Sequence, residues 1–305
     1  MNKLFAIINP ILLFSSISYC QNVTIKGTVV NKKKGEVIPF VSIQIIQAKK
    51  YFDSDDSGNF LFESEITDSV VFSCIGYEDI RLPIKDLVIS SKIELIEKVY
   101  LLKDVIVSNK KPQIIGIISE RQTRSFSGEN ESDSYEIVTR ISFSDTPQRC
   151  TINKVFFKQR NFDPENPLRL HIYEISENGL PGVEVLTAQV ILKKEDNVNG
   201  QLEIDVTDQN IIIEGKGFYV GIQWINSSVG KQVKGIKSDT GIGETNQISE
   251  RLTYHRGKIF EHEWFGFYDK GMYFPPSLEN KIGKKLPPVS GNPINMLAAA
   301  EITIL

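Results

Sequence analysis

Three consecutive segments decide the fold of this chain: Pro39-Phe-Val-Ser-Ile-Gln-Ile45, Asp53-Ser-Asp-Asp-Ser-Gly-Asn59 and Ser69-Val-Val-Phe-Ser-Cys-Ile75. The first and the last alternate apolar with polar or small residues, which is the pattern of a half-buried β-strand. The middle segment is a cluster of turn residues, in which Gly58 supplies a positive φ and the Asp and Ser side chains bond to turn amides. We therefore predict two strands on either side of a hairpin turn.

The same strand pattern continues on both sides of these segments. Short apolar runs are separated by Gly, Asn, Asp and Ser clusters and show no helical period, which indicates a β-sandwich. In the polar turn 31–36, Gly35 is placed to take a positive φ. The predicted strands lie at residues 24–30, 40–46, 51–52, 59–62, 69–74, 93–95 and 100–107.

Four motifs of this region resemble, in the same order, those of the carboxypeptidase-like regulatory domain. They are Gly27-Thr-Val-Val30, Ile38-Pro-Phe-Val-Ser-Ile43, Ser54-Asp-Asp-Ser-Gly-Asn-Phe60 and Phe72-Ser-Cys-Ile-Gly-Tyr77. The resemblance implies a seven-stranded sandwich of the transthyretin or immunoglobulin type over residues 21–108. It also implies an exported protein of a Bacteroidetes-type bacterium, in which such modules often precede TonB-dependent outer-membrane receptors. Only residues 108–305 follow here, too few for a plug and a large barrel, so the receptor function is not expected.

The first twenty residues have the pattern of a signal peptide. Lys3 precedes an apolar run at residues 4–14, and small residues lead to a cleavage site after residue 20. The run is shorter than the roughly 20 residues that a membrane span needs. Cys20 leaves a lipoprotein as the alternative, although Tyr19 does not suit the pocket before a lipid-modified cysteine. We expect export to the periplasm, the outer-membrane surface or the exterior, with no transmembrane span in the mature chain.

Charge and cysteine content exclude two further classes of protein. The net charge is −3 and the longest basic run is Lys32-Lys33-Lys34, so no nucleic-acid partner is expected. Three cysteines are too few for a disulfide scaffold. Cys74 and Cys150 lie inside apolar strands of different predicted domains, so we expect two buried thiols, with a disulfide between them as the alternative.

A second domain follows a polar linker at residues 109–134. Residues 135–305 again show strand alternation with Gly turns, which predicts a jelly-roll-like β-sandwich, similar in style to galactose-binding-like accessory domains. A short strand at 114–118 inside the linker is expected to belong to this domain. One predicted strand has its two faces clearly marked: Leu168, Leu170 and Ile172 on one side, Arg169, His171 and Tyr173 on the other.

Three arrangements were weighed as metal sites, and none is favoured. His171 and Glu174 have H-x-x-E spacing, but residues i and i+3 of a strand point to opposite faces. His255, His262 and Glu263 would bind zinc only if a hairpin brought them together. The Asp53 turn lacks the acidic residues that a calcium loop of the EF-hand type needs at positions 57 and 64. No nucleophile elbow or phosphate loop is present, so neither a cofactor nor a catalytic set is expected.

Aromatic residues of the second domain supply the candidate binding site. Exposed rings commonly hold sugars by stacking, whereas buried rings fill the core of a sandwich. The candidates for a carbohydrate site are Trp264, Phe267, Tyr268 and Tyr273, with core packing as the alternative.

The sequence thus predicts an exported binding or scaffold protein of the cell envelope without catalysis of its own. Its partner would be an envelope protein or a glycan. The alternatives are a carbohydrate-binding surface protein and a metal-dependent hydrolase or its accessory subunit.

Overall fold

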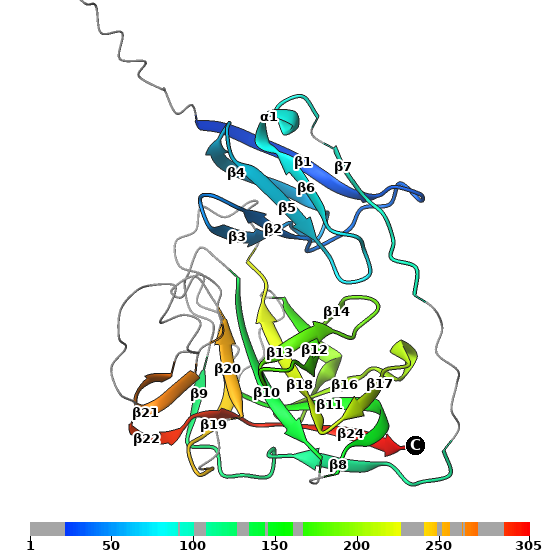
Figure 1. Cartoon of the computed structure of the whole chain (residues 1–305), viewed down its shortest axis with the longest axis vertical. Helices are drawn as coiled ribbons and strands as arrows, with labels where there is room; N and C mark the ends of the chain where they lie inside the picture. Colours follow the sequence, from blue (N-terminus) through cyan, green and yellow to red (C-terminus); the bar gives the residue numbers. More distant parts are fainter. Residues whose placement is uncertain are drawn as a thin grey trace, which may run out of the picture.

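The computed structural model describes residues 22–90, 92–100, 108–126, 134–143, 146–160, 167–226, 241–248, 252–256, 264, 266–273 and 290–305. These residues are almost wholly β-structure, as the sequence predicts. They form an N-terminal module (residues 22–100) and a larger second module (the described residues from 108 onward), with the first standing over the second (Figure 1). Within the described residues no helix is long and apolar enough to cross a membrane.

The N-terminal module is a sandwich of two small sheets. One has the order β4 (Asn59–Glu65), β1 (Asn22–Asn31) and β7 (Lys92–Leu95), and the other β3 (Lys50–Asp53), β2 (Ser42–Ile45), β5 (Ser69–Ser73) and β6 (Ile80–Pro83). A single-turn helix, α1 (Ile84–Leu87), follows β6. Alternate residues of both sheets point inward and form one apolar core, which includes Ile25, Ile43, Phe60, Val70 and Phe72.

Two predictions about this module are wrong in detail. The turn after Asp53 is not a hairpin, because it leads from β3 in one sheet to β4 in the other. Its local chemistry is as predicted: Gly58 has φ +71°, and the Asp55 carboxylate accepts the amide of Ser57 at 3.0 Å. The strand expected from residue 40 begins two residues later, because Phe40 has a positive φ of 53°. Gly35 has the expected positive φ, and the strand predicted beyond residue 100 lies outside the described residues.

The second module is a sandwich of two larger antiparallel sheets. The first has the order β13 (Pro181–Glu184), β12 (Leu168–Ile175), β18 (Gly217–Trp224), β10 (Tyr135–Ser142) and β20 (Thr253–Arg256), and β14 (Val190–Ile191) also pairs with β12. The second has the order β15 (Asn197–Val198), β16 (Gln201–Asp205), β11 (Gln148–Arg160), β19 (Gly241–Thr245) and β23 (Asn295–Met296). Around this path lie β17 (Ile212–Gly215), β24 (Ala298–Ile304), β8 (Gln113–Gly116) and β9 (Arg124–Phe126), while β21 (Gly266–Tyr273) pairs with β22 (Ser290–Pro293).

The expected linker at 109–134 contributes two strands to the second module. β8 pairs with β24, and β9 pairs with β19. Ile115 packs against the core of this module, whereas its neighbour Ile114 is exposed. The short strand predicted at 114–118 therefore exists at 113–116 and belongs to the second module, where the sequence placed it.

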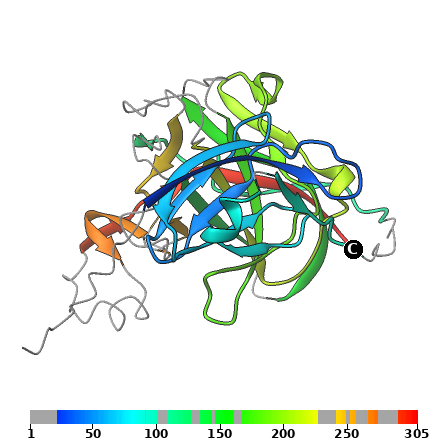
Figure 2. The same ribbon diagram turned by 90° about the horizontal axis from the view of Figure 1, so that it is seen from above.

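The outer face of the first sheet is the feature that positions the site. Leu168, Leu170 and Ile172 of β12 lie in the core between the sheets, as their alternation predicts. Arg169, His171 and Tyr173 point the other way and are nevertheless buried. The cause is visible from above, where the N-terminal module lies across the second one (Figure 2). Cys74 and Cys150 are both buried free thiols, one in each module.

Candidate functional site

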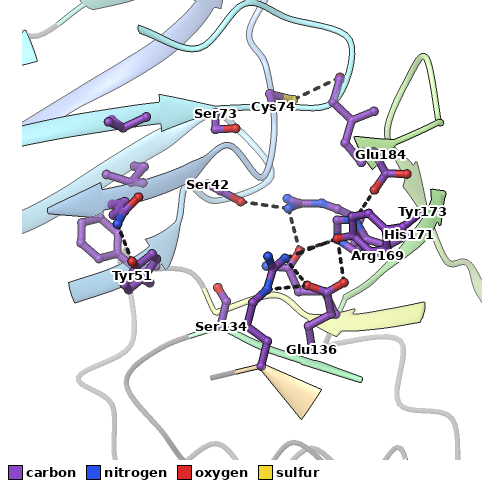
Figure 3. Close-up of a pocket in the computed structure, with 17 residues that line it drawn as sticks. Ser42, Tyr51, Ser73, Cys74, Ser134, Glu136, Arg169, His171, Tyr173 and Glu184 are labelled. Carbon is purple, nitrogen blue, oxygen red and sulfur yellow. Dashed lines mark hydrogen bonds and ion pairs between the residues drawn. The ribbon is translucent and has the colours of Figure 1, made fainter. Parts of the chain in front are cut away.

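A cavity of about 560 Å³ lies between the two modules, and we call it the intermodule cavity (Figure 3). Polar side chains from both modules line it. The N-terminal module contributes Ser42, Gln44, Tyr51, Val71 and Ser73, and the second module contributes Ser134, Glu136, Arg169, His171, Tyr173, Glu184, Gln223 and Arg256.

Strand alternation places these side chains in the cavity. In β2, Ile43 and Ile45 fill the core of the N-terminal module, so Ser42 and Gln44 face outward. In β5, Val70 and Phe72 are buried in the same core, so Val71 and Ser73 face outward beside them. The outward face of this sheet is thus polar and small, and it forms one wall of the cavity.

Arg169 of β12 ties the two modules together. Its Nη1 donates to Ser42 Oγ at 3.0 Å and to Gln223 Oε1 at 2.8 Å, while Nη2 donates to the carbonyl oxygen of Phe40. Nη2 also lies 3.5 Å from Asp53 Oδ1. Both charged side chains are at most 5% exposed, so they neutralise each other away from bulk water.

Asp53 is an interface residue as well as the first residue of the turn. Its Oδ1 accepts the Ser42 hydroxyl at 2.9 Å, and its Oδ2 accepts the Ser134 hydroxyl and the Asn226 amide, the latter at 3.1 Å. Its own amide donates to the Asn226 carbonyl at 2.8 Å. A buried carboxylate held by both modules in this way fixes how they dock.

The loop after β5 makes a second docking contact. Ile75 packs against the core of the second module. Gly76 has φ +92°, and a Cβ built on it would lie 2.7 Å from the Thr187 carbonyl oxygen. The Ile75-Gly76 pair therefore needs glycine because two backbones meet there. Gln189 Nε2 donates to the Pro39 carbonyl at 2.9 Å and extends the same interface.

His171 sits between two acceptors on the floor of the cavity. Its Nδ1 lies 2.6 Å from Glu184 Oε2, and its Nε2 lies 2.9 Å from Gln223 Oε1. Because Arg169 donates to the same Gln223 atom, that atom is the amide oxygen, and a doubly protonated ring satisfies both neighbours. Burial disfavours the imidazolium, but the carboxylates of Glu136 and Glu184 outweigh it and raise the pKa of His171.

Glu136 and Arg256 form the second charged pair of the floor. Arg256 donates to Glu136 Oε2 through Nη2 and through Nε at 3.1 Å, and the Tyr173 hydroxyl donates to Glu136 Oε1 at 2.8 Å. Burial disfavours the carboxylate, yet Arg256, His171 and the Tyr173 hydroxyl together lower the pKa of Glu136. Glu136 is therefore ionised at neutral pH, and its charge is matched by Arg256.

The residues proposed from sequence as a carbohydrate site are only partly described. Trp264 is half-buried, its ring meets Tyr173 edge to face at 6.1 Å, and the Arg256 guanidinium lies 4.4 Å from its ring centre. It thus borders the residues of the cavity floor. Phe267, Tyr268 and Tyr273 belong to β21, and their side chains lie outside the described residues.

The structure separates the members of the candidate metal sets. His171 pairs with Glu184 rather than Glu174, and Glu174 is exposed. His255 is buried beside Tyr135, 3.1 Å from its hydroxyl, and burial together with the charge of Arg124 lowers its pKa to about 3. His262 and Glu263 lie outside the described residues. Within the described part of the chain, no group of three or more His, Cys, Asp or Glu is placed to hold a metal.

Sequence reasoning missed the cavity but held one signal of it. The outer face of β12 reads Arg169, His171, Tyr173, an unusual run of large polar groups opposite a fully apolar face. Such a face is more polar than core and bulkier than an ordinary solvated strand, so it marks a covered polar surface. Asp53 carried no signal, because an Asp at the start of a turn is expected in any case.

Comparison with solved structures yields distant likenesses only. The chain is 10% identical to the cysteine protease and lectin-like domains of a surface-layer-associated protein of Clostridium difficile, with a TM-score of 0.29 over 60% of this chain and 37% of that one. A structure of infectious bursal disease virus, Gt strain, matches at 10% identity and TM-score 0.27 over 93% of this chain and 65% of that one. A proposed carbohydrate binding protein of Bacteroides uniformis matches at 11% identity and TM-score 0.18 over 92% and 97%. At these scores the likenesses carry no functional argument.

Comparison of the sequence itself is more informative for the N-terminal module. No curated protein matches the chain. The family model of the CarboxypepD_reg-like domain, however, matches residues 25–107. The match covers the two small sheets, including the wall of the cavity built from β2, β3 and β5. This segment of the chain is therefore a CarboxypepD_reg-like domain, in agreement with its four sequence motifs.

Proposed function

We propose that this chain is an exported binding protein of the cell envelope that holds a small polar ligand in the intermodule cavity and performs no catalysis of its own. The cavity carries the proposal. Its volume of about 560 Å³ falls in the range of small-molecule sites, and its walls present side chains from two rigid sheets. A site shared by two modules is also a common place for a ligand.

The charges of the cavity support binding rather than hydrolysis. A glycoside hydrolase needs one carboxylic acid that keeps its proton near neutral pH, which requires a raised pKa. Glu136 has a lowered pKa instead, and both of its oxygens are occupied by Arg256 and Tyr173. Glu184 is occupied by His171 and by the Ile172 amide at 3.0 Å. These carboxylates hold the site in shape.

Export is supported by the sequence alone. The leader pattern at residues 1–20 and the CarboxypepD_reg-like domain behind it are the two observations that favour the envelope. Expression of the full chain in a Bacteroidetes host, followed by cell fractionation and mass spectrometry, tests it. We expect a mature N-terminus at Gln21 in the envelope or medium. An intact Met1 in the cytoplasm would contradict export, and a lipid-modified Cys20 would instead establish the lipoprotein alternative.

The cavity is tested by filling it. Ser73→Trp places a large ring into the cavity, while Ser69→Trp adds the same ring to the same face of β5 at a position that does not line it. Small polar compounds, both neutral and charged, would be screened by thermal shift. We expect at least one class to stabilise the wild-type chain and Ser69→Trp but not Ser73→Trp. If no class does so, the cavity is not a binding site and the proposal fails.

A further inference from the structure

The cavity also indicates the chemical class of its ligand. Resting on the proposed function, we infer that the intermodule cavity takes a neutral, hydroxyl-rich ligand, a small saccharide, in preference to a charged one. The inference rests on the balance of charge, the hydrogen-bonding groups left over, and the ring on the wall opposite the charged floor.

The charges around the cavity already match one another. Arg169 faces Asp53, Arg256 faces Glu136, and His171 faces Glu184, so three cationic side chains meet three carboxylates. A ligand with a net charge would either break one of these pairs or remain unpaired in a site of low dielectric constant, and both are costly. A neutral ligand disturbs none of them.

Donors and acceptors nevertheless remain for a ligand. Arg256 uses Nε and Nη2 on Glu136 and Tyr173, which leaves its Nη1 group without a bond among the described residues. Arg169 Nε is buried and has no hydrogen-bond partner there either. Ser73 brings a hydroxyl on the opposite wall. Sugar hydroxyls both donate and accept, so one ligand type can satisfy groups of both kinds.

Tyr51 offers an aromatic surface on the N-terminal wall. Gln44 donates to its hydroxyl, which fixes the ring beside the cavity. The face of an aromatic ring is electron-rich and attracts C–H groups, and a pyranose ring presents such groups on its own face. The wall with Tyr51 would then hold the sugar ring, and the charged floor would bond its hydroxyls.

Matched ligand pairs test the charge argument in the full mature chain. Glucose with glucuronate, and galactose with galacturonate, differ only in a carboxylate, and the disaccharides cellobiose and maltose and the dipeptide Ala-Ala extend the panel. We expect calorimetry to show binding of at least one neutral saccharide, with its uronate about tenfold weaker or more. Tighter binding of a uronate or of the dipeptide would overturn the inference and leave the proposed function standing.

Matched variants test the location. Tyr51→Leu removes the ring and keeps an apolar side chain, and Tyr100→Leu makes the same change at a partly exposed position outside the cavity lining. We expect Tyr51→Leu to weaken saccharide binding about fivefold or more and Tyr100→Leu to leave it unchanged. Saccharide binding that survives both Tyr51→Leu and Ser73→Trp would place the sugar elsewhere and overturn the inference. If no neutral saccharide binds, the inference is wrong, and if no compound of any class binds, the proposed function fails with it.

Discussion

The N-terminal module and the second module satisfy their buried charges in different ways. In the first, Asp68 accepts the backbone amides of Gln47 and Ala48 at 2.9 and 3.0 Å, both from its own module. In the second, Glu136 and Arg169 lie on the outer face of a sheet and are buried only because the other module covers them.

The difference bears on which module depends on the other. The covered face of the second module carries several charged groups, whereas the N-terminal module contributes only Asp53 to the interface as a buried charge. A module whose buried charges bond to its own backbone keeps them satisfied wherever it is placed. The second module would expose or leave unpaired part of its polar face if the first were displaced, so we expect it to be the dependent partner.

Loss of Arg169 should have the largest effect. Arg169→Ala leaves the Asp53 carboxylate buried without its cation, and breaking one partner of such a pair costs about 3–5 kcal/mol. Urea denaturation measures the change in the free energy of unfolding. Arg149→Ala is the control, since the Arg149–Glu214 pair is exposed and should change stability by less than about 1 kcal/mol. If Arg169→Ala matches this control, the two modules are not held together by the buried pair.

Acid should destabilise the second module through His255. This side chain has a pKa of about 3 in the folded chain and 6.5 when unfolded, so the unfolded state takes up a proton first as the pH falls below 6.5. The free energy of unfolding should drop by about 2 kcal/mol from pH 7 to pH 5 on this account. The comparison is with His255→Gln, in which the acid limb should be flatter by that amount. An unchanged slope would contradict the burial of a neutral imidazole.

His171 should act in the opposite direction at the intermodule cavity. Its folded pKa is raised, so its contribution to stability is fully present below pH 6.5 and is lost as the pH rises through the folded value. His171→Gln should therefore flatten the alkaline side of the same stability profile. Two histidines of one module would thus report on two environments, an apolar interior and a charged interface.

Local pattern and local chemistry were predictable from the sequence of both modules. The positive φ of Gly58 and the inward face of Leu168, Leu170 and Ile172 depend on neighbours in the chain. So do the four motifs that identify the N-terminal module. For such features the sequence contains all the information that the physical argument needs.

Contacts between distant segments were not predictable in the same way. The Asp53 turn has the same residues whether it closes a hairpin or leads to another sheet, and only the pairing of β4 with β1 decides between them. The outward residues Ser42 and Ser73 look alike on a solvated sheet and on a cavity wall. Arg169 and Asp53 are 116 positions apart, and nothing near either residue marks the other as its partner.

Gly76→Ala should test the backbone contact between the modules. Its new Cβ would meet the Thr187 carbonyl at 2.7 Å and would also sit at φ +92°. Gly35→Ala is matched in conformation, with φ +72°, but no heavy atom lies within 4 Å of its Cβ position. We expect both changes to cost about 1 kcal/mol for the positive φ, and Gly76→Ala to cost about 1–2 kcal/mol more. Equal losses of unfolding free energy would mean that the two backbones do not meet at this glycine.

The thiols should show the difference between the modules without changing stability. Burial raises the pKa of Cys74 to about 11 and that of Cys150 to about 12, so neither forms the reactive thiolate at pH 8. Cys74 lines the intermodule cavity, whereas Cys150 lies in the core of the second module. Labelling with iodoacetamide, followed by mass spectrometry, should be slow at both cysteines in the native chain. Arg169→Ala should accelerate it at Cys74 well before Cys150, because parting the modules opens the cavity but not the core; equal acceleration at both would mean that the modules unfold together.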